Sequence, residues 1–553
     1  MKLPNKYNYG TLFGFSGLEG ENEHDGDLIG MTMRRPVSIR FDAKIPVTLE
    51  IPLEDPQIEY ILCDSIKTKD LLLVFADKDT VLGRTDKAAD ITAEGAQTLE
   101  TGGVKVLLCN DFAYALLQKG DRFVFCRAQT AQAAAEAANE KLRLDLDALA
   151  EKKRAYFEQF PACPRAEYER LYYKCLSINK VNVYSPQNGI DCRFTTPDRL
   201  PHHHMWLWDS MFHAMAFALY NPEMAKDAIR AVLQCQREDG FIPHMMKSKT
   251  DTSAITQPQV IAWAVLEVYR QIKDDAFLAE CADKIAAFLL WFQKNRDIDG
   301  NGLLEWKTDY SNVRCRCDES GMDNSPRFDT TETLDAIDCN SFMVNDCRCL
   351  AEIYRLLGKD AEARRFDSIA DDTAKRINDL LWDEERGAYC DRTLSGKLTG
   401  VRSVCSFLPL FAGVATEARA ASLVRLLKDE TVFATPLPVP SISRDHPDFG
   451  TDMWRGGVWL NFNYFVIRGR HRYGYHDEAR ELTETTLRAV NRWFEEAGTV
   501  FEFFDPYNET VPWCLNRKGP KPQKPDYRTA FHTISDYNWS ACFTLLMLLG
   551  KTE

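Results

Sequence analysis

The segment NPEMAKDAIRAVLQCQREDG, residues 221–240, combines the local signals of an amphipathic helix. Asn221 is a suitable capping residue, Pro222 suits the first helical position, and Glu223 adds an acid to the first turn. Apolar residues then recur at helical spacing, and Gly240 is expected to end the helix. The apolar face consists of Met224, Ala228, Ala231, Val232 and Cys235. The segment therefore predicts a helix that buries one face against the rest of the chain.

The same pattern recurs from Glu167 to the C-terminus, for example in residues 366–381 and 479–494. About twelve helical segments can be counted in this part of the sequence. Several are followed by a glycine and a short β-like run, at residues 302–306, 387–391 and 498–502. Repeated helical hairpins of this kind predict either a closed ring or an open solenoid, because periodicity alone does not choose between them.

The sequence before residue 130 has a different character. Short β-like runs at 46–51, 71–75, 104–108 and 123–125 alternate with turn clusters of Gly, Asp and Asn, which is typical of a β-sandwich. Residues 131–164 are rich in Ala, Glu, Lys and Leu and predict a solvated connecting helix. The predicted domains are therefore a β-sandwich over 1–130, a linker helix over 131–164 and a helical domain over 165–553.

Length and composition set further bounds. At 553 residues the chain is too long for one compact core, and 45% hydrophobic residues suffice for a globular interior. The net charge of −14 and the absence of a long basic run argue against a nucleic-acid partner. No window approaches the roughly 20 apolar residues of a membrane span, which predicts no membrane partner and a cytoplasmic protein. The sequence does not reveal the oligomeric state.

Three features resemble metal sites. Seventeen cysteines are present without paired C-x-x-C clusters, so free thiols in a reducing compartment are the preferred interpretation. The alternative is a metal site built from Cys315, Cys317, Cys339, Cys347 and Cys349. Residues 297–302 begin like a calcium loop, but Thr308 stands where an EF-hand needs Glu, so a helix-ending turn is preferred over calcium. Residues 202–204 are consecutive histidines whose side chains diverge, and they are predicted to be loop residues near a pocket rim. We predict no metal and no cofactor.

The segment ESGMDNSPR, residues 319–327, places two carboxylates in a shaped turn. Gly321 permits backbone angles that other residues resist, and Pro326 keeps Ser325 out of helix. An ordinary acidic turn and an active-site loop are both compatible with this composition.

Five other segments accompany this loop: WLWDS at 206–210, TQP at 256–258, DMWRGGVW at 452–459, FEFFDP at 501–506 and YNWS at 537–540. Together and in this order they resemble the glycoside hydrolases of family 63 and their mannosylglycerate hydrolase relatives. The resemblance runs from about Glu167 to the C-terminus. It implies a mainly α fold in which six helical hairpins close into an (α/α)6 toroid, here with an N-terminal β-sandwich domain.

The resemblance also implies catalytic roles. Asp323 matches the acid that protonates the leaving glycosidic oxygen, and Glu502 matches the base that activates water in an inverting reaction. Without the resemblance, Glu502 could equally be a strand residue that points to solvent by alternation. We expect apolar neighbours or a nearby carboxylate, for which Glu319 is available, to keep Asp323 protonated.

The remaining motif residues suit a sugar ring. Flat apolar faces and hydrogen-bonding groups would form the subsite around the cleaved sugar, with Gly321 in its wall. The candidates are Trp208, Asp209, Gln257, Trp306, Arg455, Trp459 and Trp539. Core packing is the alternative for the tryptophans, and we expect about two of the four to be structural.

Two departures from the family pattern concern the substrate. Asp318 precedes the Glu-Ser-Gly of the acid loop where many relatives carry Trp, and Gly457 stands where larger relatives carry Pro. These departures bear on which sugar derivative is cleaved. The resemblance implies an inverting, exo-acting α-glycosidase, and we expect an α-glucosidase on a small glucoside or oligosaccharide. The alternatives are a phosphorylase on the same toroid and a non-catalytic sugar-binding or helical scaffold protein.

Overall fold

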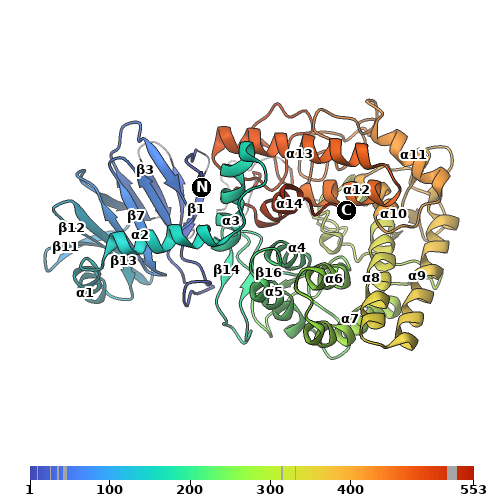
Figure 1. Ribbon diagram of the computed structural model, residues 1–553, viewed down its shortest axis with the longest axis horizontal. Coiled ribbons are helices and arrows are strands. Elements are labelled where there is room, and N and C mark those ends of the chain that lie inside the picture. Colours follow the sequence, from blue (N-terminus) through green and yellow to red (C-terminus); the bar gives the residue numbers. More distant parts are fainter. Residues whose placement is uncertain are drawn as a thin grey trace.

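The computed structural model describes residues 1–8, 10–24, 26–33, 37–41, 47–312, 315–330, 332–519 and 532–553. Figure 1 shows a β-rich N-terminal part beside a larger helical part, with helix α2 running between them.

The N-terminal part consists of two antiparallel sheets packed face to face. The strand orders are β1-β2-β3-β4-β9 and β10-β11-β12-β13-β8-β7-β6-β5. Phe13 and Phe41 of the first sheet meet Phe75 and Phe125 of the second, with ring centroids 4.8 and 4.9 Å apart. The predicted β-sandwich is therefore confirmed.

The strands are β1 (Thr11–Gly14), β2 (Ile29–Met33), β3 (Val37–Phe41), β4 (Val47–Ile51), β5 (Ile58–Ile61), β6 (Ser65–Thr68), β7 (Leu72–Asp77), β8 (Thr80–Arg84), β9 (Asp90–Ala93), β10 (Gln97–Thr101), β11 (Val104–Cys109), β12 (Phe112–Lys119) and β13 (Arg122–Ala128). The four predicted runs correspond to β4, β7, β11 and β13, and Pro46 of the first run lies outside the described residues.

The prediction of one solvated connecting helix is wrong. Two helices follow the sandwich, α1 (Ala131–Lys141) and α2 (Leu146–Ala155), and Asp145 caps the second by accepting a hydrogen bond from the backbone N–H of Ala148. Ala134 and Ala138 of α1 are fully buried against the outer face of the larger sheet. The alanine-rich composition reflects close helix-on-sheet packing, because small side chains let α1 approach the strands.

The helical part is a closed ring. Helix α4 packs against α6, α6 against α8, α8 against α10, α10 against α12, α12 against α14, and α14 returns to α4. Outer helices stand beside them, for example α5 beside α4 and α13 beside α12 (Figure 1). Closure distinguishes this ring from an open solenoid. The described residues thus form the predicted (α/α)6 toroid.

The twelve ring helices within the described residues are α3 (Glu169–Val181), α4 (Leu207–Phe217), α5 (Pro222–Gln234), α6 (Ile261–Ile272), α7 (Asp275–Asn295), α8 (Ile337–Leu356), α9 (Asp360–Leu380), α10 (Leu408–Phe411), α11 (Glu417–Leu427), α12 (Leu460–Arg472), α13 (His476–Ala497) and α14 (Asn538–Leu548). Two-residue strands lie in the connections: β14 (Val183–Tyr184), β15 (Phe194–Thr195), β16 (Met205–Trp206), β17 (Met245–Met246), β18 (Leu334–Asp335), β19 (Trp382–Asp383), β20 (Ala388–Tyr389) and β21 (Arg392–Thr393).

Burial follows the position of each helix in the ring. Every residue of α4 and α14 is buried, whereas the outer helix α5 buries one face and is capped by Asn221, whose side chain accepts from the backbone N–H of Met224. Helix α5 ends at Gln234, six residues before Gly240, so the prediction that Gly240 ends it is wrong. Gly240 instead has a φ of 95°, and a Cβ there would lie 2.5 Å from the carbonyl oxygen of Ala287, so glycine serves a loop that packs against α7.

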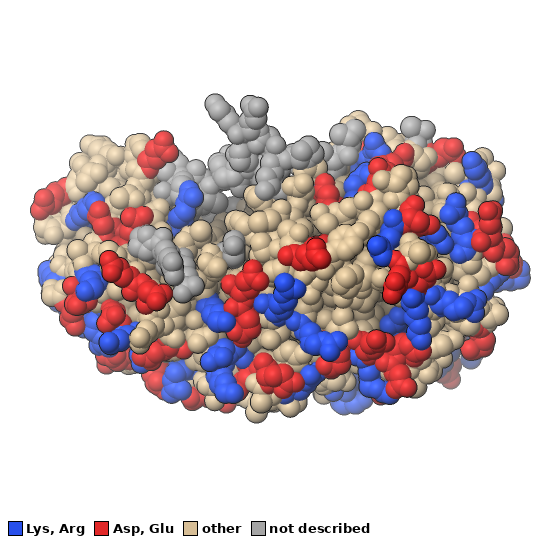
Figure 2. All heavy atoms as spheres, turned by 90° about the horizontal axis from the view of Figure 1, so that it is seen from above, with Lys and Arg blue, Asp and Glu red and all other residues tan. Residues whose placement is uncertain are grey.

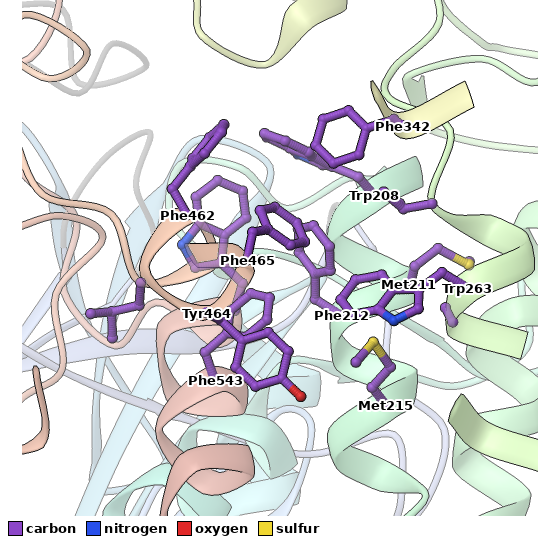
Figure 3. Packing of buried hydrophobic residues seen from close by; sticks show 14 of the residues in the cluster. Trp208, Met211, Phe212, Met215, Trp263, Phe342, Phe462, Tyr464, Phe465 and Phe543 are labelled. Atoms are coloured by element: carbon purple, nitrogen blue, oxygen red, sulfur yellow. The ribbon is translucent and has the colours of Figure 1, made fainter. Parts of the chain in front are cut away.

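Aromatic side chains fill the centre of the ring. Figure 3 shows Phe212, Trp263, Phe465 and Phe543 converging from four inner helices. Phe465 contacts Phe212 at 6.1 Å and Phe411 at 4.9 Å between ring centroids. This packing separates the end of the ring where the inner helices begin from the end where they finish.

The face shown in Figure 2 carries acidic and basic side chains interspersed, without an extended basic area. Among the described residues, no helix combines the length and the apolar character needed to cross a membrane.

Candidate active site

A cavity of about 220 Å³ lies where the inner helices begin. Helices α4 and α14 contribute residues of their first turns. The connections that precede α6, α8, α12 and α14 supply most of the remaining wall. The lining residues are Pro197, His202, Trp206, Trp208, Asp209, His244, Gln257, Asp318, Gly321, Asp323, Met453, Trp454, Trp459, Glu502, Arg517, Lys518, Tyr537 and Trp539.

Eight of the ten predicted site residues line this cavity, including both Asp323 and Glu502. The other two do not. Trp306 is buried and donates its indole N–H to Asp338 at 3.0 Å, so it belongs to the core behind the cavity. Arg455 forms an ion pair with Asp329 at 2.6 Å outside the cavity. The predicted sugar-binding roles of Trp306 and Arg455 therefore have no geometric support.

The loop that carries Asp323 is shaped by Gly321. A short 3-10 helix, η3 (Asp318–Ser320), ends at Gly321, which has a φ of 70°. A Cβ at this position would lie 2.3 Å from Cζ2 of Trp208, so a side chain would collide with the indole. Glycine is thus required for two independent reasons, backbone conformation and close approach to a cavity wall.

Glu319 does not influence Asp323 in the predicted way. Its carboxylate is fully buried, pairs with Arg296 at 2.5 Å, and accepts hydrogen bonds from the backbone N–H groups of Thr256 at 3.2 Å and Lys307 at 2.7 Å. These contacts anchor the acid loop to two neighbouring loops. Asp318 is the carboxylate that responds to Asp323: burial and the charge of Asp323 raise the pKa of Asp318 to about 6.

The expectation that Asp323 is held protonated is also wrong for this conformation. Lys518 Nζ lies 2.6 Å from Asp323 Oδ2. Burial alone would raise the pKa of Asp323, but Lys518 and Arg517 outweigh it and the pKa is lowered. Asp323 is therefore ionised here, and it can act as an acid only after this ion pair is weakened.

Glu502 occupies a short extended run after α13, as the sequence predicted. Phe501 bridges to Ser535, and the backbone N–H of Glu502 donates to the carbonyl of Ile534 at 3.0 Å. The side chain is 1% exposed and accepts from Arg517 Nε at 3.0 Å. Arg517 also lies 3.3 Å from His202 Nε2, which fixes the guanidinium between the two cavity residues.

Asp209 has an unusual environment at the start of α4. The carboxyl group is 2% exposed, and its Oδ1 is buried without a hydrogen-bond partner among the described residues. Burial, together with Asp198 and Glu502, raises the pKa of Asp209 well above its usual range. A buried polar oxygen in a cavity wall is costly unless a ligand satisfies it. A sugar hydroxyl would supply the missing partner.

Aromatic faces enclose the carboxylates. Trp454 and Trp459 stack with ring centroids 3.8 Å apart, and Trp539 lies edge-on to Trp208 at 5.3 Å. These rings give the wall flat apolar surfaces beside the carboxylates, which suits the C–H face of a sugar.

Several lining residues were not among the predicted site residues. Trp206, Trp454 and Tyr537 each stand in a quoted motif but were not selected individually, and His202 was predicted only to lie near a pocket rim. Sequence reasoning missed His244, Arg517 and Lys518 altogether. Arg517 and Lys518 could have been noticed as two adjacent basic residues before Gly519, with Arg517 fifteen positions after Glu502.

Loop-to-loop hydrogen bonds hold the cavity together. Asn324 Nδ2 donates to Asp452 Oδ1 at 3.3 Å, and Asn324 Oδ1 accepts from the backbone N–H of Trp454 at 3.0 Å. Asp452 Oδ2 also accepts from the backbone N–H of Gly519 at 2.7 Å. These bonds connect the loop of Asp323, the loop of residues 452–459 and the loop of Lys518.

Three groups of described side chains bring ligand atoms within 4.8 Å of one another: Asp297/Asp299/Glu305, Cys315/Asp318/Asp323 and His24/His203/His204. Burial and nearby carboxylates raise the pKa of Glu305 to about 8, and this acidic group could hold a hard cation such as calcium. Of the five cysteines considered for a metal site, only Cys315 belongs to such a group among the described residues. The sixteen cysteines other than Cys109 are free thiols.

The described residues form a closed ring of helical hairpins with two carboxylates and aromatic walls at one end, and this (α/α)6 fold is shared with a solved glucoamylase. The family described as the mannosylglycerate hydrolase MGH1-like glycoside hydrolase domain matches residues 202–540, and the chain belongs to that family.

Individual relatives agree with this assignment. A mannosylglycerate hydrolase of Rubrobacter radiotolerans is 28% identical over 404 residues, covering 57% of this chain and 88% of the relative. Mannosylglycerate hydrolase MGH1 of Selaginella moellendorffii is 26% identical over 412 residues, covering 60% and 80%.

Solved structures share the fold. The family 63 mannosylglycerate hydrolase of Thermus thermophilus in complex with glucose has a TM-score of 0.55 at 23% identity, covering 69% of this chain and 100% of that one. A bacterial glucoamylase complexed with acarbose has a TM-score of 0.65 at 12% identity and covers 100% of this chain and 96% of its own. The second likeness includes the N-terminal sandwich.

Proposed function

We propose that the protein is an inverting, exo-acting α-glycosidase, with Asp323 as the general acid and Glu502 as the general base. The observation that carries this proposal is that two carboxylates from distant parts of the sequence line one small cavity. Each has a cation beside it, Lys518 for Asp323 and Arg517 for Glu502. A non-catalytic sugar-binding protein would need the aromatic walls but not both acids.

The reaction would proceed in one displacement. Glu502 takes a proton from water, the resulting hydroxide oxygen bonds to the anomeric carbon, and the glycosidic carbon–oxygen bond breaks as Asp323 gives its proton to the departing oxygen. Asp323 must first gain a proton, which requires Lys518 to leave the ion pair when the substrate binds. Inversion further requires carboxyl groups about 6.5–9.5 Å apart, with room for the water.

The cavity volume supports exo action on a single terminal sugar. Its 220 Å³ is below the roughly 300–1,000 Å³ typical of ligand pockets, so one pyranose ring would fill it. Trp208, Trp459 and Trp539 would face the C–H side of the ring, while Asp209 and Gln257 would bind its hydroxyl groups. Gly321 would complete the wall beside Trp208.

We propose an α-glucoside as the substrate. A probable mannosyl-oligosaccharide glucosidase of Schizosaccharomyces pombe, 29% identical over 210 residues, supports glucose at the cleaved position. The second candidate is a mannoside with an acidic aglycone, as the named activity of the Rubrobacter relative suggests. Lys518 and Arg517 favour that candidate, because a displaced Lys518 could pair with a carboxylate of the aglycone.

We also propose a cytoplasmic location. Its support is that the cysteines other than Cys109 have free thiols and most of them are buried, which suits a reducing compartment.

A panel of α- and β-linked glucosides and mannosides, including a mannosyl glycerate, tests the proposal when product anomers are followed by NMR. Immediate release of the β-anomer from an α-linked substrate is expected. Release of the α-anomer would exclude inversion and remove Glu502 as the base. A sugar phosphate formed only with added inorganic phosphate would indicate a phosphorylase. Binding without turnover of any substrate would indicate a sugar-binding protein.

A further inference from the structure

We propose that His24, His203 and His204 form a binding site for a transition metal ion, zinc by its chemistry, between the sandwich and the toroid. His24 belongs to the loop between β1 and β2, and the other two belong to the loop between β15 and β16. One ligand atom of each side chain lies within 4.8 Å of the others. The sequence separates the residues by about 180 positions, so only the packing of the two domains creates the cluster.

The three rings form one compact group, in which the His24 and His204 rings lie with their planes 8° apart and the His203 ring is tilted by 57° and 60° to them. Ring centroids are 4.7 Å apart for His24 and His204, 4.9 Å for His24 and His203, and 4.3 Å for His203 and His204. Near-equal distances place the rings at the corners of a triangle. Three imidazoles around a common centre are the ligand set of many zinc sites.

The nitrogen geometry is compatible with a metal ion. His204 Nδ1 lies 2.7 Å from His24 Nε2. Zinc–nitrogen bonds of about 2.0–2.1 Å in a tetrahedron would hold two ligand nitrogens about 3.3 Å apart. Binding would therefore open this pair by roughly half an ångström, which ring rotation can supply.

Contacts outside the cluster orient two of the ligands. His203 Nδ1 lies 3.1 Å from the carbonyl oxygen of Pro201, a contact in which the ring nitrogen donates and which orients the imidazole. The backbone N–H of His24 donates to Gln187 Oε1 at 2.6 Å. Nearby, Asn22 and Ser185 exchange hydrogen bonds between the domains. The loop of His24 is thus held against the toroid before any metal binds.

The site would reinforce one wall of the active-site cavity. His202, next to the proposed ligand His203, lines the cavity, and its Nδ1 lies 2.7 Å from Asp198 Oδ2. Trp206 lines the cavity two residues after His204. A metal ion held by His203 and His204 would fix this segment and fasten the sandwich to it. The inference concerns the domain junction and does not depend on the proposed glycosidase reaction.

Metal binding to the full chain tests the proposal. The protein is dialysed against chelator, then titrated with zinc chloride by calorimetry, with the bound metal counted by elemental analysis. We expect about one zinc ion per chain and a higher melting temperature with zinc. The variants His24→Asn, His203→Asn and His204→Asn should each weaken binding at least about tenfold. His446→Asn, a change outside the cluster, should bind as the parent does.

Cysteines could also bind zinc, so ligand identity needs its own measurement. Cobalt(II) should give visible absorption bands without the near-ultraviolet thiolate charge-transfer band, and Asp323→Asn should leave the spectrum unchanged. A thiolate band, or zinc bound equally well by a His24/His203/His204 triple variant whose circular dichroism is native, would overturn the proposal. Should a single variant fail to fold, the cobalt spectrum of the parent still decides the ligand type.

Discussion

The two ends of the toroid differ in whether their charged side chains have partners. Where the inner helices begin, a 220 Å³ cavity holds the carboxylates of Asp323, Glu502 and Asp209, and the last has an oxygen without a partner among the described residues. Where they finish, a larger cavity of about 430 Å³ is lined by charged residues that pair with one another. Glu267, for example, pairs with Arg270 at 2.8 Å and Arg468 at 3.0 Å.

The comparison teaches that cavity size does not identify the reactive end. Arg270 and Arg472 at the far end lie in the last turns of α6 and α12, where positive charge complements the helix dipoles. They therefore have a structural explanation. The buried Asp209 at the near end has none, because burying a carboxyl group without a full set of partners costs free energy. Asp209 therefore indicates the functional end, because no contact among the described residues offsets the free energy of burying its Oδ1.

Removal of the two catalytic candidates should give the largest effect. Asp323→Asn and Glu502→Gln should each lower kcat by about 10²–10⁴-fold, because each removes a proton transfer from the transition state. Initial rates on the best substrate of the panel, with circular dichroism as the folding check, measure this. Glu267→Gln, the matched change at the far end, should retain the parental rate. Near-parental turnover in Asp323→Asn would remove that residue from the reaction.

Asp209 should have the next largest effect. Asp209→Ala should lower kcat/KM by about 10–100-fold, corresponding to the roughly 1.5–3 kcal/mol of a hydrogen bond to a charged or strongly polar group. Asp209→Asn keeps the shape and an oxygen acceptor and should recover part of the loss. Steady-state kinetics of both variants check this. Equal activity of the alanine variant and the parent would show that Oδ1 does not bind the sugar.

Gly321→Ala should destabilise the near end by roughly 1–3 kcal/mol and reduce activity, because it combines a left-handed φ with a collision against Trp208. Gly358→Ala is the matched control. Gly358 has a φ of 72° and no described atom within 4 Å of an added Cβ, so it tests backbone strain alone. Urea unfolding and kcat measure both variants. Equal losses of stability and activity in the two variants would mean that the Trp208 side chain moves aside at little cost.

The ion pair of Lys518 should set the pH profile. Because Lys518 lowers the pKa of Asp323, Lys518→Met should raise that pKa and keep the acid protonated to higher pH. The basic limb of kcat/KM should therefore move to higher pH. Lys428→Met, which removes a surface lysine paired with Glu478, should leave the profile in place. An unmoved basic limb in Lys518→Met would show that Lys518 does not set the pKa of Asp323 in the free enzyme, whose essential groups kcat/KM reports.

The smallest effect is expected at the far end. Glu267→Gln should change the free energy of unfolding by about 1 kcal/mol or less, since its ion pairs are partly solvated. Thermal unfolding measures this change. A large loss of activity in this variant would contradict the contrast between the two ends.

Much of the fold could be predicted because its signals are local. Asn221 and Pro222 mark the start of α5 through their own backbone preferences, and the alternating run 104–108 marks β11. The length of α5 and the break between α1 and α2 were predicted wrongly. Gly240 is needed for its approach to Ala287, and the alanines of α1 for their packing on a sheet, and neither contact is visible in the sequence.

The candidate site was predicted less evenly. Motif resemblance selected Asp323 and Glu502, which line one cavity, but Glu319 proved to be an anchor paired with Arg296. Lys518 and Arg517 carry no motif, so their contacts with the two acids were missed. His24 could not be connected with His203 and His204, because the link depends on how two domains pack.

By itself, the sequence determined where helices and strands begin, which faces are apolar, and which acids resemble those of a hydrolase family. Those properties depend on neighbours within a few positions or on matched motifs. Only the tertiary structure decided the partner of each buried charge, since pairing depends on distances between segments far apart in the chain. Those partners distinguish Glu319, which holds the acid loop in place through Arg296, from Asp323, which Lys518 keeps ionised. They also distinguish both from Asp209, whose Oδ1 has no partner among the described residues.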